Sequence, residues 1–333
     1  ERLLRDNGMA VLDSRPVHAV SSPGTRTIRT TEHLPGLNRT RTVVKTPRGD
    51  VTSVTVTNPG APISESTTWT EEFPFKTEAD YDAIEFMLAD RVYRPSYEGY
   101  RRALDDVGED AAVRTAIEGA PIHTLMYQVF GLDQFAVQLA ENEERVMRLI
   151  AILEAKQRTL YEIVAQSPAR IVLVGGNYAP EVLGKPRFDA FVVPHWKTVC
   201  DLLHEHGKLV GCHLDANNKL WAREVGDSAL DWIESFSPAP SSDMTVAEAR
   251  AMWPGKVLFL NFPAVVHLAE PVRIREATLQ ILREAAPGDR LVVAEIDGSE
   301  LAVKVAKTRT GWRMTTRGAI HDVRVQEKHG EAI

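Results

Sequence analysis

Cysteine is nearly absent from the chain, since only Cys200 and Cys212 occur among 333 residues. Two cysteines at this spacing form neither a disulfide framework nor a CxxC zinc pair. No apolar run approaches the length of a membrane span. The formal net charge is −7, and no basic stripe is interleaved with aromatic residues, which argues against a nucleic-acid partner. The scarcity of cysteine favours a reducing, cytoplasmic setting.

Motifs for the common nucleotide-dependent and hydrolytic chemistries are missing as well. No GxGxxG fingerprint, P-loop or GxSxG elbow occurs, and no helix start lies directly behind the Gly175-Gly176 pair. The chain begins at Glu1 with a charged stretch that looks like the end of a helix and not like a signal peptide. We therefore expect further sequence upstream of Glu1.

The chain does contain a regular alternation of short apolar strands and helices. Six β-branched apolar runs are predicted as strands, over residues 112–117, 170–174, 209–212, 232–236, 256–260 and 290–294. Apolar strands that alternate with helices indicate a parallel sheet covered on both faces. We expect an α/β fold, a (β/α)8 barrel of TIM type, as a single domain over residues 1–333. Its first strand would lie within residues 1–40 or upstream of Glu1.

Two segments are expected to depart from the regular barrel. Residues 40–58 contain two β-rich runs around Pro47-Arg48-Gly49-Asp50, a pattern that predicts a β-hairpin excursion. Residues 299–333 show no closing helix, and Leu301–Val325 alternates basic, threonine and apolar residues. That alternation predicts an extra β segment or a divergent C-terminal tail.

Polar side chains gather where the strand at residues 209–212 ends. His213, Asp215 and Asn217 follow the apolar run at every second position, so a β-strand would point all three to one face. Burying an imidazole, a carboxylate and a carboxamide together is costly unless that end opens onto a ligand. The alternative is a helix cap or a solvated turn. By the same alternation Cys212 should point away, as a buried structural thiol.

The other predicted strands also end in polar residues, at the edge where a (β/α)8 barrel carries its active site. His213 is the side chain most easily tuned near neutrality and is the candidate catalytic acid, with Asp215 to orient or charge its ring. If a metal is bound, a mixed nitrogen and oxygen site of His213, Asp215 and Glu295 is the candidate. The candidate substrate-binding residues are His123, Asn177, Tyr178, Asn217, Glu234 and Asn261.

Residues 188–217 combine a helix that contains Pro194, a His-Gly-Lys link and a strand that ends in His-Leu-Asp-Ala-Asn. This arrangement resembles the uroporphyrinogen decarboxylase superfamily, whose members share the link and a strand that ends in His-x-Asp-Gly-Asn. The stretch Asp243–Arg250 is similar to the corresponding segment in the methyltransferase branch of that superfamily. The resemblance covers about residues 120–285.

The resemblance implies a TIM-type barrel, a homodimer and one of two chemistries. Our leading hypothesis is methyl transfer from a small methylated substrate, such as an aryl methyl ether, to a corrinoid carried by a partner protein, often with zinc activation. His213 and Asp215 would then assist product departure by donating a proton or by holding a metal. The alternative is cofactor-free decarboxylation of a tetrapyrrole or another carboxylic acid. A non-catalytic ligand-binding barrel is the second alternative.

Departures from the family pattern bear on this choice. Asp215 stands where zinc-dependent methyltransferases have a cysteine, and no cysteine follows Cys212, which argues against the usual zinc site. Ala216 replaces the usual glycine. The arginine-rich N-terminal motif of the decarboxylases is not visible, and the strand ends supply no arginine that could hold carboxylates.

Overall fold

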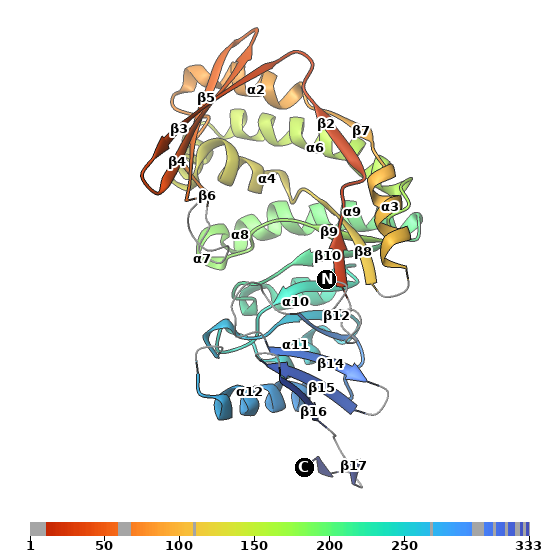
Figure 1. Ribbon diagram of the computed structural model, residues 1–333. Coiled ribbons are helices and arrows are strands. Elements are labelled where there is room, and N and C mark those ends of the chain that lie inside the picture. Colours follow the sequence, from red (N-terminus) through yellow and green to blue (C-terminus); the bar gives the residue numbers. More distant parts are fainter. Residues whose placement is uncertain are drawn as a thin grey trace. The chain divides into compact units, whose positions relative to one another are not determined.

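The computed structural model describes residues 11–58, 68–108, 111–266 and 269–294, and five short strands between residues 303 and 332. The chain divides into two compact units. Figure 1 labels many of the helices and strands named below. Unit 1 comprises Glu1–Ser14, Ala103–Ala116 and Arg170–Ile333, and unit 2 comprises Arg15–Arg102 and Ile117–Ala169. Each unit is therefore assembled from segments that lie far apart in the sequence.

Unit 1 is built on a seven-stranded sheet in which the strands follow the order β1-β8-β9-β10-β11-β12-β13. The recorded pairings between neighbouring strands are all parallel. The strands are β1 (Val11–Ser14), β8 (Ala111–Ile117), β9 (Ile171–Val174), β10 (Leu209–His213), β11 (Trp232–Phe236), β12 (Val257–Asn261) and β13 (Leu291–Ala294). All six runs predicted from the sequence are strands, and residues 1–40 supply the seventh.

The pairing of this sheet contradicts the predicted (β/α)8 barrel. A barrel closes only when its first and last strands pair. In the described part of the chain, β1 pairs with β8 alone and β13 with β12 alone, so the two edges do not meet. Alternation of strands and helices predicts parallel pairing between successive strands, but a closed and an open sheet share that pattern. The predicted barrel is wrong, and unit 1 carries an open parallel sheet.

Helices that connect these strands bury large aromatic side chains against the sheet. Phe188 and Trp221 stack with ring centroids 4.4 Å apart and an interplanar angle of 6°, and Trp196 packs edge-on to Phe188. Helix α9 packs on β10, where Val210 and Cys212 are fully buried. The connecting elements are α7 (Pro180–Leu183), α8 (Lys185–Arg187), η4 (Phe188–Val192), α9 (Val193–Glu205), η5 (Lys219–Trp221), α10 (Ala222–Asp227), α11 (Val246–Met252), η6 (Ala264–Val266) and α12 (Pro271–Glu284).

Antiparallel strands follow the parallel sheet at the C-terminal end of the chain. A three-stranded sheet contains β14 (Val303–Thr308), β15 (Gly311–Thr316) and β16 (Ala319–Val323). A two-stranded ladder contains β17 (Glu327–Lys328) and β18 (Glu331–Ala332). The sequence predicts an extra β segment or a divergent C-terminal tail over Leu301–Val325, and strands β14 to β16 lie within this stretch.

Unit 2 contains a four-stranded antiparallel sheet in the order β3-β4-β5-β6. Its strands are β3 (Arg26–Leu34), β4 (Leu37–Thr46), β5 (Gly49–Thr57) and β6 (Thr68–Glu72). The hairpin predicted over residues 40–58 corresponds to β4 and β5, whose turn is closed by Thr46 Oγ1 donating to the Gly49 carbonyl at 2.8 Å. A separate antiparallel pair joins β2 (His18–Ser21) to β7 (Val92–Pro95).

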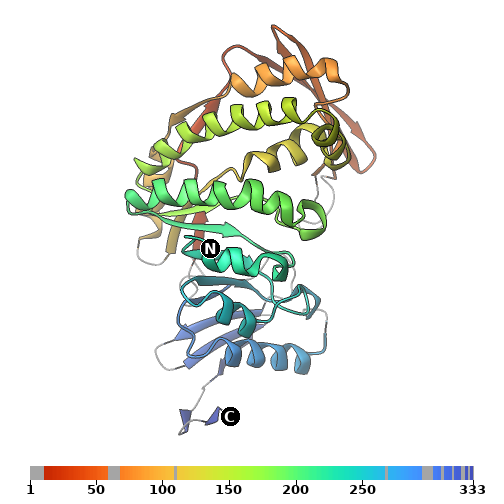
Figure 2. The ribbon, with the colours of Figure 1, turned by 180° about the vertical axis from the view of Figure 1, so that it is seen from behind.

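The helices of unit 2 pack around an aromatic centre formed by Phe75, Tyr81 and Phe130, whose ring centroids lie 4.8–5.9 Å apart. Helix α6 lies beside α2, which Figure 2 shows from behind. No helix in the described residues is long and apolar enough to cross a membrane. The helical elements are η2 (Glu78–Asp80), α2 (Tyr81–Ala89), α3 (Glu98–Val107), which continues into unit 1, α4 (Pro121–Thr124), η3 (Leu125–Phe130), α5 (Leu132–Glu141) and α6 (Glu143–Ala165).

Candidate functional site

The strand pair β10–β11 places titratable side chains on one face of the unit 1 sheet. In the parallel register His213 lies opposite Glu234, and Gly211 lies opposite Trp232. A Cβ atom at Gly211 would come within 2.2 Å of two ring carbons of Trp232, so the indole covers this glycine. Because side chains alternate along a strand, these residues lie on the face opposite Cys212 and the helix α9 that packs on β10.

Four charged side chains make a continuous series of contacts, which we call the His213 cluster. Arg114 donates from Nη1 to Glu234 Oε1, and the His213 ring contacts Glu234 Oε2 through Nδ1. The second ring nitrogen of His213, Nε2, lies 3.4 Å from Asp215 Oδ2. Side-chain exposure rises from 10% at Glu234 to 34% at His213 and 50% at Asp215. The cluster therefore runs from the interior toward solvent, with the imidazole between two carboxylates.

These contacts determine the protonation of the His213 cluster. Hydrogen bonds with Asp215 and then Glu234 raise the pKa of His213 to about 9. The hydrogen bond with His213 lowers the pKa of Asp215. Burial by itself would raise the pKa of Glu234, but hydrogen bonds from His213 and Arg114 outweigh it and the pKa is lowered. At neutral pH His213 is therefore a cation with a proton on each ring nitrogen, which suits it to donate one.

Asn218 holds the loop that carries Asp215. Its side chain is fully buried, where Nδ2 donates to the Ala216 carbonyl at 2.7 Å and Oδ1 accepts from Trp221 Nε1 at 3.2 Å. The Asp243 carboxylate accepts the backbone N–H of Asn218 at 2.8 Å. These contacts restrict the loop after β10 and so the position of Asp215 relative to His213.

The structure brings the two predicted catalytic residues, His213 and Asp215, into contact and joins Glu234 to them. Sequence reasoning assigned Glu234 to substrate binding, whereas its carboxylate contacts His213 and Arg114. Arg114 was missed. The sequence did contain a sign of its role, because Arg114 is the one charged residue in the otherwise uncharged strand Ala111–Ile117. Asn218 and Asp243 carry no comparable signal, since polar loop residues are common.

The predicted asparagines make local contacts in unit 1. Exposed Asn177 accepts the backbone N–H of the residue two positions on, at 3.2 Å, as a turn residue does. Asn217 donates from Nδ2 to Glu181 Oε1 at 2.9 Å. Buried Asn261 donates from Nδ2 to the Ser235 carbonyl at 3.2 Å. None of these three hydrogen bonds reaches the His213 cluster, so a role for the asparagines in binding substrate stays a prediction.

The three remaining predicted site residues, Tyr178, His123 and Glu295, make no described contact with the His213 cluster. Tyr178 is 1% exposed, and its hydroxyl donates to the Gly175 carbonyl at 2.8 Å and accepts from Trp196 Nε1 at 3.2 Å. Its side chain therefore belongs to the packed interior of unit 1. His123 is buried in α4 of unit 2. Glu295 lies outside the described residues.

The predicted metal site of His213, Asp215 and Glu295 stays a prediction, because Glu295 lies outside the described residues. Both ring nitrogens of His213 face carboxylates, Glu234 and Asp215, so neither offers a lone pair to a metal. Cys212 is fully buried on the opposite face, and burial raises the pKa of its thiol well above the usual range. Where the structure describes the chain, no group of three or more His, Cys, Asp or Glu side chains could hold a metal.

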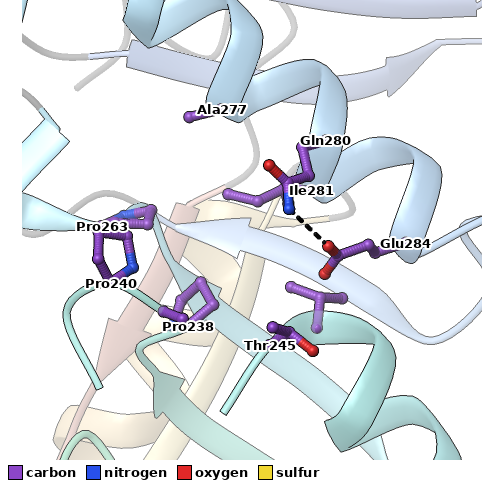
Figure 3. Close-up of a pocket in the computed structure, with 10 residues that line it drawn as sticks. Pro238, Pro240, Thr245, Pro263, Ala277, Gln280, Ile281 and Glu284 are labelled. Carbon is purple, nitrogen blue, oxygen red and sulfur yellow. Dashed lines mark hydrogen bonds between the residues drawn. The ribbon is translucent and has the colours of Figure 1, made fainter. Parts of the chain in front are cut away.

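A separate pocket of about 100 Å³ lies in unit 1 between α12, the start of α11 and two proline-containing loops (Figure 3). Glu284 accepts from Gln280 Nε2 at 2.9 Å and from the backbone N–H of Ala247 at 3.2 Å, so it ties α12 to α11. The pocket is lined by Pro238, Ala239, Pro240, Thr245, Val246, Pro263, Ala277, Gln280, Ile281 and Glu284. No member of the His213 cluster lines this pocket.

Comparison with known proteins identifies two family models. The model of Uroporphyrinogen decarboxylase (URO-D) matches residues 65–295, which is more than half of the chain. The model of Propionyl-coenzyme A carboxylase BT domain matches residues 264–333. No curated protein matches the chain.

Among solved structures, one match is the crystal structure of a mutant of phosphofructokinase-2 from Escherichia coli. The two sequences are 10% identical, and the match covers 95% of this chain and 79% of that chain with a TM-score of 0.22. A likeness of this size carries no argument about the fold or the reaction.

Proposed function

Because the chain belongs to the uroporphyrinogen decarboxylase family, whose members are enzymes, we propose that it is a methyltransferase that acts on a small methyl ether. His213 is the proton donor of this reaction. The observation that carries the proposal is the His213 ring held between the carboxylates of Glu234 and Asp215.

Transfer of a methyl group from an ether to a nucleophile breaks the methyl–oxygen bond and leaves the electron pair on oxygen. The oxyanion then needs a proton. Nε2 of His213 is suited to supply it, because Nδ1 contacts the buried Glu234 while Nε2 lies toward the half-exposed Asp215. A phenol has a pKa of about 10, and the pKa of His213 is about 9. Proton transfer between groups matched in this way has little energetic cost.

The other members of the His213 cluster prepare the ring. Glu234 orients it, and Arg114 keeps the Glu234 carboxylate ionised. Asp215, at the solvent end, favours the charged imidazole and offers a path by which a proton returns after each turnover. A corrinoid carried by a partner protein would supply the nucleophile, while this chain would bind the ether and donate the proton.

Decarboxylation is the second candidate, and one observation favours it. Arg114 lies within the His213 cluster, and arginine binds carboxylates well. Against it, Glu234 already neutralises Arg114. Loss of CO2 also leaves a carbanion, a far stronger base than a phenolate, so a donor with a pKa near 9 is less closely matched to it.

The test measures both reactions with the same protein. Methyl transfer from a panel of methyl ethers to a reduced corrinoid is followed spectroscopically, and CO2 release is followed from a panel of carboxylic acids. We expect methyl transfer, and we expect His213→Gln to lower kcat by about 10²–10⁴ because glutamine cannot donate a cationic proton.

His204→Gln is the matched control. His204 also faces a carboxylate, with Nε2 at 2.8 Å from Asp231 Oδ2. It lies in the last turn of α9, before strand β10 begins, whereas His213 lies at the end of that strand. The substitution of His204 should therefore leave kcat unchanged. CO2 release without methyl transfer would contradict the proposed methyltransferase and favour the decarboxylase. Equal losses in both histidine variants would remove His213 from the mechanism.

A further inference from the structure

The strand that carries Glu234 contains one extra residue near its carboxyl end. Ile233 of β11 lies opposite Leu258 of β12. Phe236 lies opposite Leu260, so two residues of β11 correspond to one residue of β12. This is a β-bulge, a feature that re-aims side chains and is frequent next to active sites. Because Leu258 and Leu260 are two apart and share a face, their partners Ile233 and Phe236 share that face as well.

The bulge gives two nearby side chains opposite surroundings. In a regular strand Glu234 and Phe236 are two positions apart and would point to the same face. Here Glu234 lies opposite His213 and contacts its ring. Phe236 is instead fully buried and packs edge-on to Trp253, the residue that ends α11. Without the extra residue, either the carboxylate would leave the His213 cluster or the phenyl ring would leave the interior.

The residue that follows Glu234 within the bulge, Ser235, has an uncommon backbone conformation. Its φ angle is 59°, and Arg290 is the one other non-glycine residue with a positive φ in the described chain. A serine in this left-handed region is strained, and such strain persists only where the surrounding structure imposes it. The contacts that hold Ser235 therefore also decide where Glu234 points.

Hydrogen bonds on both sides of Ser235 impose this conformation. The Ser235 carbonyl accepts from Asn261 Nδ2 and from Ser237 Oγ, each at 3.2 Å. On the other side, the Glu234 carbonyl accepts the backbone N–H of Leu214 at 2.9 Å. Asn261 ends the neighbouring strand β12 and is 3% exposed. Its amide thus fixes the peptide that follows Ser235 from an adjacent, buried strand end.

We propose that Asn261 is a positioning residue, which holds the bulge at Ser235 and thereby directs the Glu234 carboxylate toward the His213 ring. It acts through the backbone, since its hydrogen bond goes to the Ser235 carbonyl and not to the cluster. The inference rests on the proposed function only for its effect on turnover. The alternative is that Asn261 satisfies a buried carbonyl and contributes to stability alone.

The first experiment observes the contact between His213 and Glu234. An imidazole N–H that donates to a carboxylate gives a proton NMR resonance far downfield of the amide signals, and His213→Gln identifies this resonance by abolishing it. Asn261→Leu keeps the approximate volume of the side chain but removes the donor. We expect the resonance to move upfield or disappear, because the charge-assisted hydrogen bond is no longer held in place. An unchanged resonance in the folded variant, or no such resonance in the unchanged protein, would overturn the proposal.

The second experiment varies the strain and leaves Asn261 in place. Glycine adopts a positive φ without strain, so Ser235→Gly should retain the resonance. Valine is β-branched and strongly disfavoured at this φ, so Ser235→Val should lose it. Loss in the glycine variant, or retention in a folded valine variant, would contradict the role of the bulge. This pair decides the matter if Asn261→Leu does not fold.

Arg290→Val is the matched control. Arg290 is the other strained residue of unit 1, and it lies at the opposite end of the β12–β13 pair from Asn261. The substitution should lower the thermal stability and leave the resonance unchanged. Equal changes of the resonance in Arg290→Val and Ser235→Val would show that any loss of stability has this effect, and would reject a positioning role.

Turnover separates this inference from the proposed function. If both hold, Asn261→Leu lowers kcat by up to about 100-fold with little change in KM, as the misplacement of a reacting group does. A changed resonance without any methyl transfer by the unchanged protein would keep the positioning role and reject the methyltransferase. Methyl transfer with unchanged kcat and an unchanged resonance in Asn261→Leu would keep the methyltransferase and reject the positioning role.

Discussion

At the scale of single residues, the His213 ring is the centre of the site because each of its nitrogens faces a different carboxylate. Glu234 approaches from the buried side and Asp215 from the exposed side. A histidine with one carboxylate partner is common on protein surfaces, and His204 is an example in this chain. Two partners with unequal burial give the ring one fixed nitrogen and one accessible nitrogen, which is the arrangement that directional proton donation needs.

The pKa of His213 predicts how stability changes with pH. In the folded protein the pKa of His213 is about 9, above the ordinary histidine pKa of 6.5. The cluster therefore stabilises the fold fully below about pH 6.5, and this contribution is lost as the pH rises through about 9. Because the ring is one-third exposed and solvent screens it, we expect a contribution on the order of 1 kcal/mol.

The measurement is the free energy of unfolding from urea titrations between pH 6 and pH 10, taken as the difference between the unchanged protein and His213→Gln. Taking the difference cancels other groups that titrate in this window. The difference should shrink as the pH rises. A difference that stays constant or grows would contradict the raised pKa.

Gly211 is the second residue whose identity the site requires. A Cβ atom there would lie 2.2 Å from the Trp232 ring, far inside contact distance. We expect Gly211→Ala to destabilise unit 1 by about 1–3 kcal/mol through overpacking, measured by denaturant unfolding. In a double-mutant cycle, Trp232→Leu should restore part of the loss, since the smaller side chain leaves room for the methyl group. Strictly additive effects would mean that the indole is not the obstacle.

At the scale of elements, the loops after β10 and β11 matter more than the strands themselves. Asn218 fills the interior of the first loop with three hydrogen bonds, and Asp243 from the second loop accepts its backbone N–H. Thr245 and Glu248 then form a reciprocal capping box at the start of α11. The two loops are thereby tied to each other and to a helix start.

This arrangement predicts opposite outcomes for two neighbouring asparagines. Asn218→Ala should destabilise the protein by about 1–3 kcal/mol, because it leaves buried groups without partners, and should also lower activity by loosening Asp215. Asn217→Ala removes one contact with Glu181 and should change stability by less than about 0.5 kcal/mol. Chemical unfolding of both variants tests this. Similar losses would show that the loop is not organised by Asn218.

At the scale of the whole molecule, the family match and the division into units do not coincide. The match begins at residue 65 and ends at residue 295, so it includes β6 to β13 and segments of both units. Strands β1 to β5 precede it. The BT-domain match begins at residue 264 and includes the antiparallel strands β14 to β18. The chain thus combines a family core with β-rich segments on either side.

The strands β3 to β5 also carry an unusual charge. Residues 26–57 contain six arginines and lysines against two acidic residues, within a chain of net charge −7. All nine residues of β3 are exposed. Basic residues on an exposed edge strand discourage pairing with other chains, which is a common protection of such edges. This protection applies to Arg26 and Arg29 of β3, whereas Arg39 of the inner strand β4 pairs with Glu71 of β6.

The sequence by itself determined the local structure and the chemistry of the strand ends. Apolar runs bounded by turns predicted six strands correctly, because local pattern decides which residues can form a buried strand. The spacing of His213 and Asp215 and the surrounding motif indicated the family and the candidate pair. Alternation also placed Cys212 on the opposite, buried face.

Only the tertiary structure decided whether the sheet closes and which side chains meet. Closure depends on contact between β1 and β13, two strands nearly 300 residues apart, and no local pattern encodes it. The partnership of Arg114 with Glu234 spans 120 residues for the same reason. Partnerships across strands depend on register and curvature. The sequence could therefore name His213 only as a candidate acid, and the fold showed which groups hold its charge.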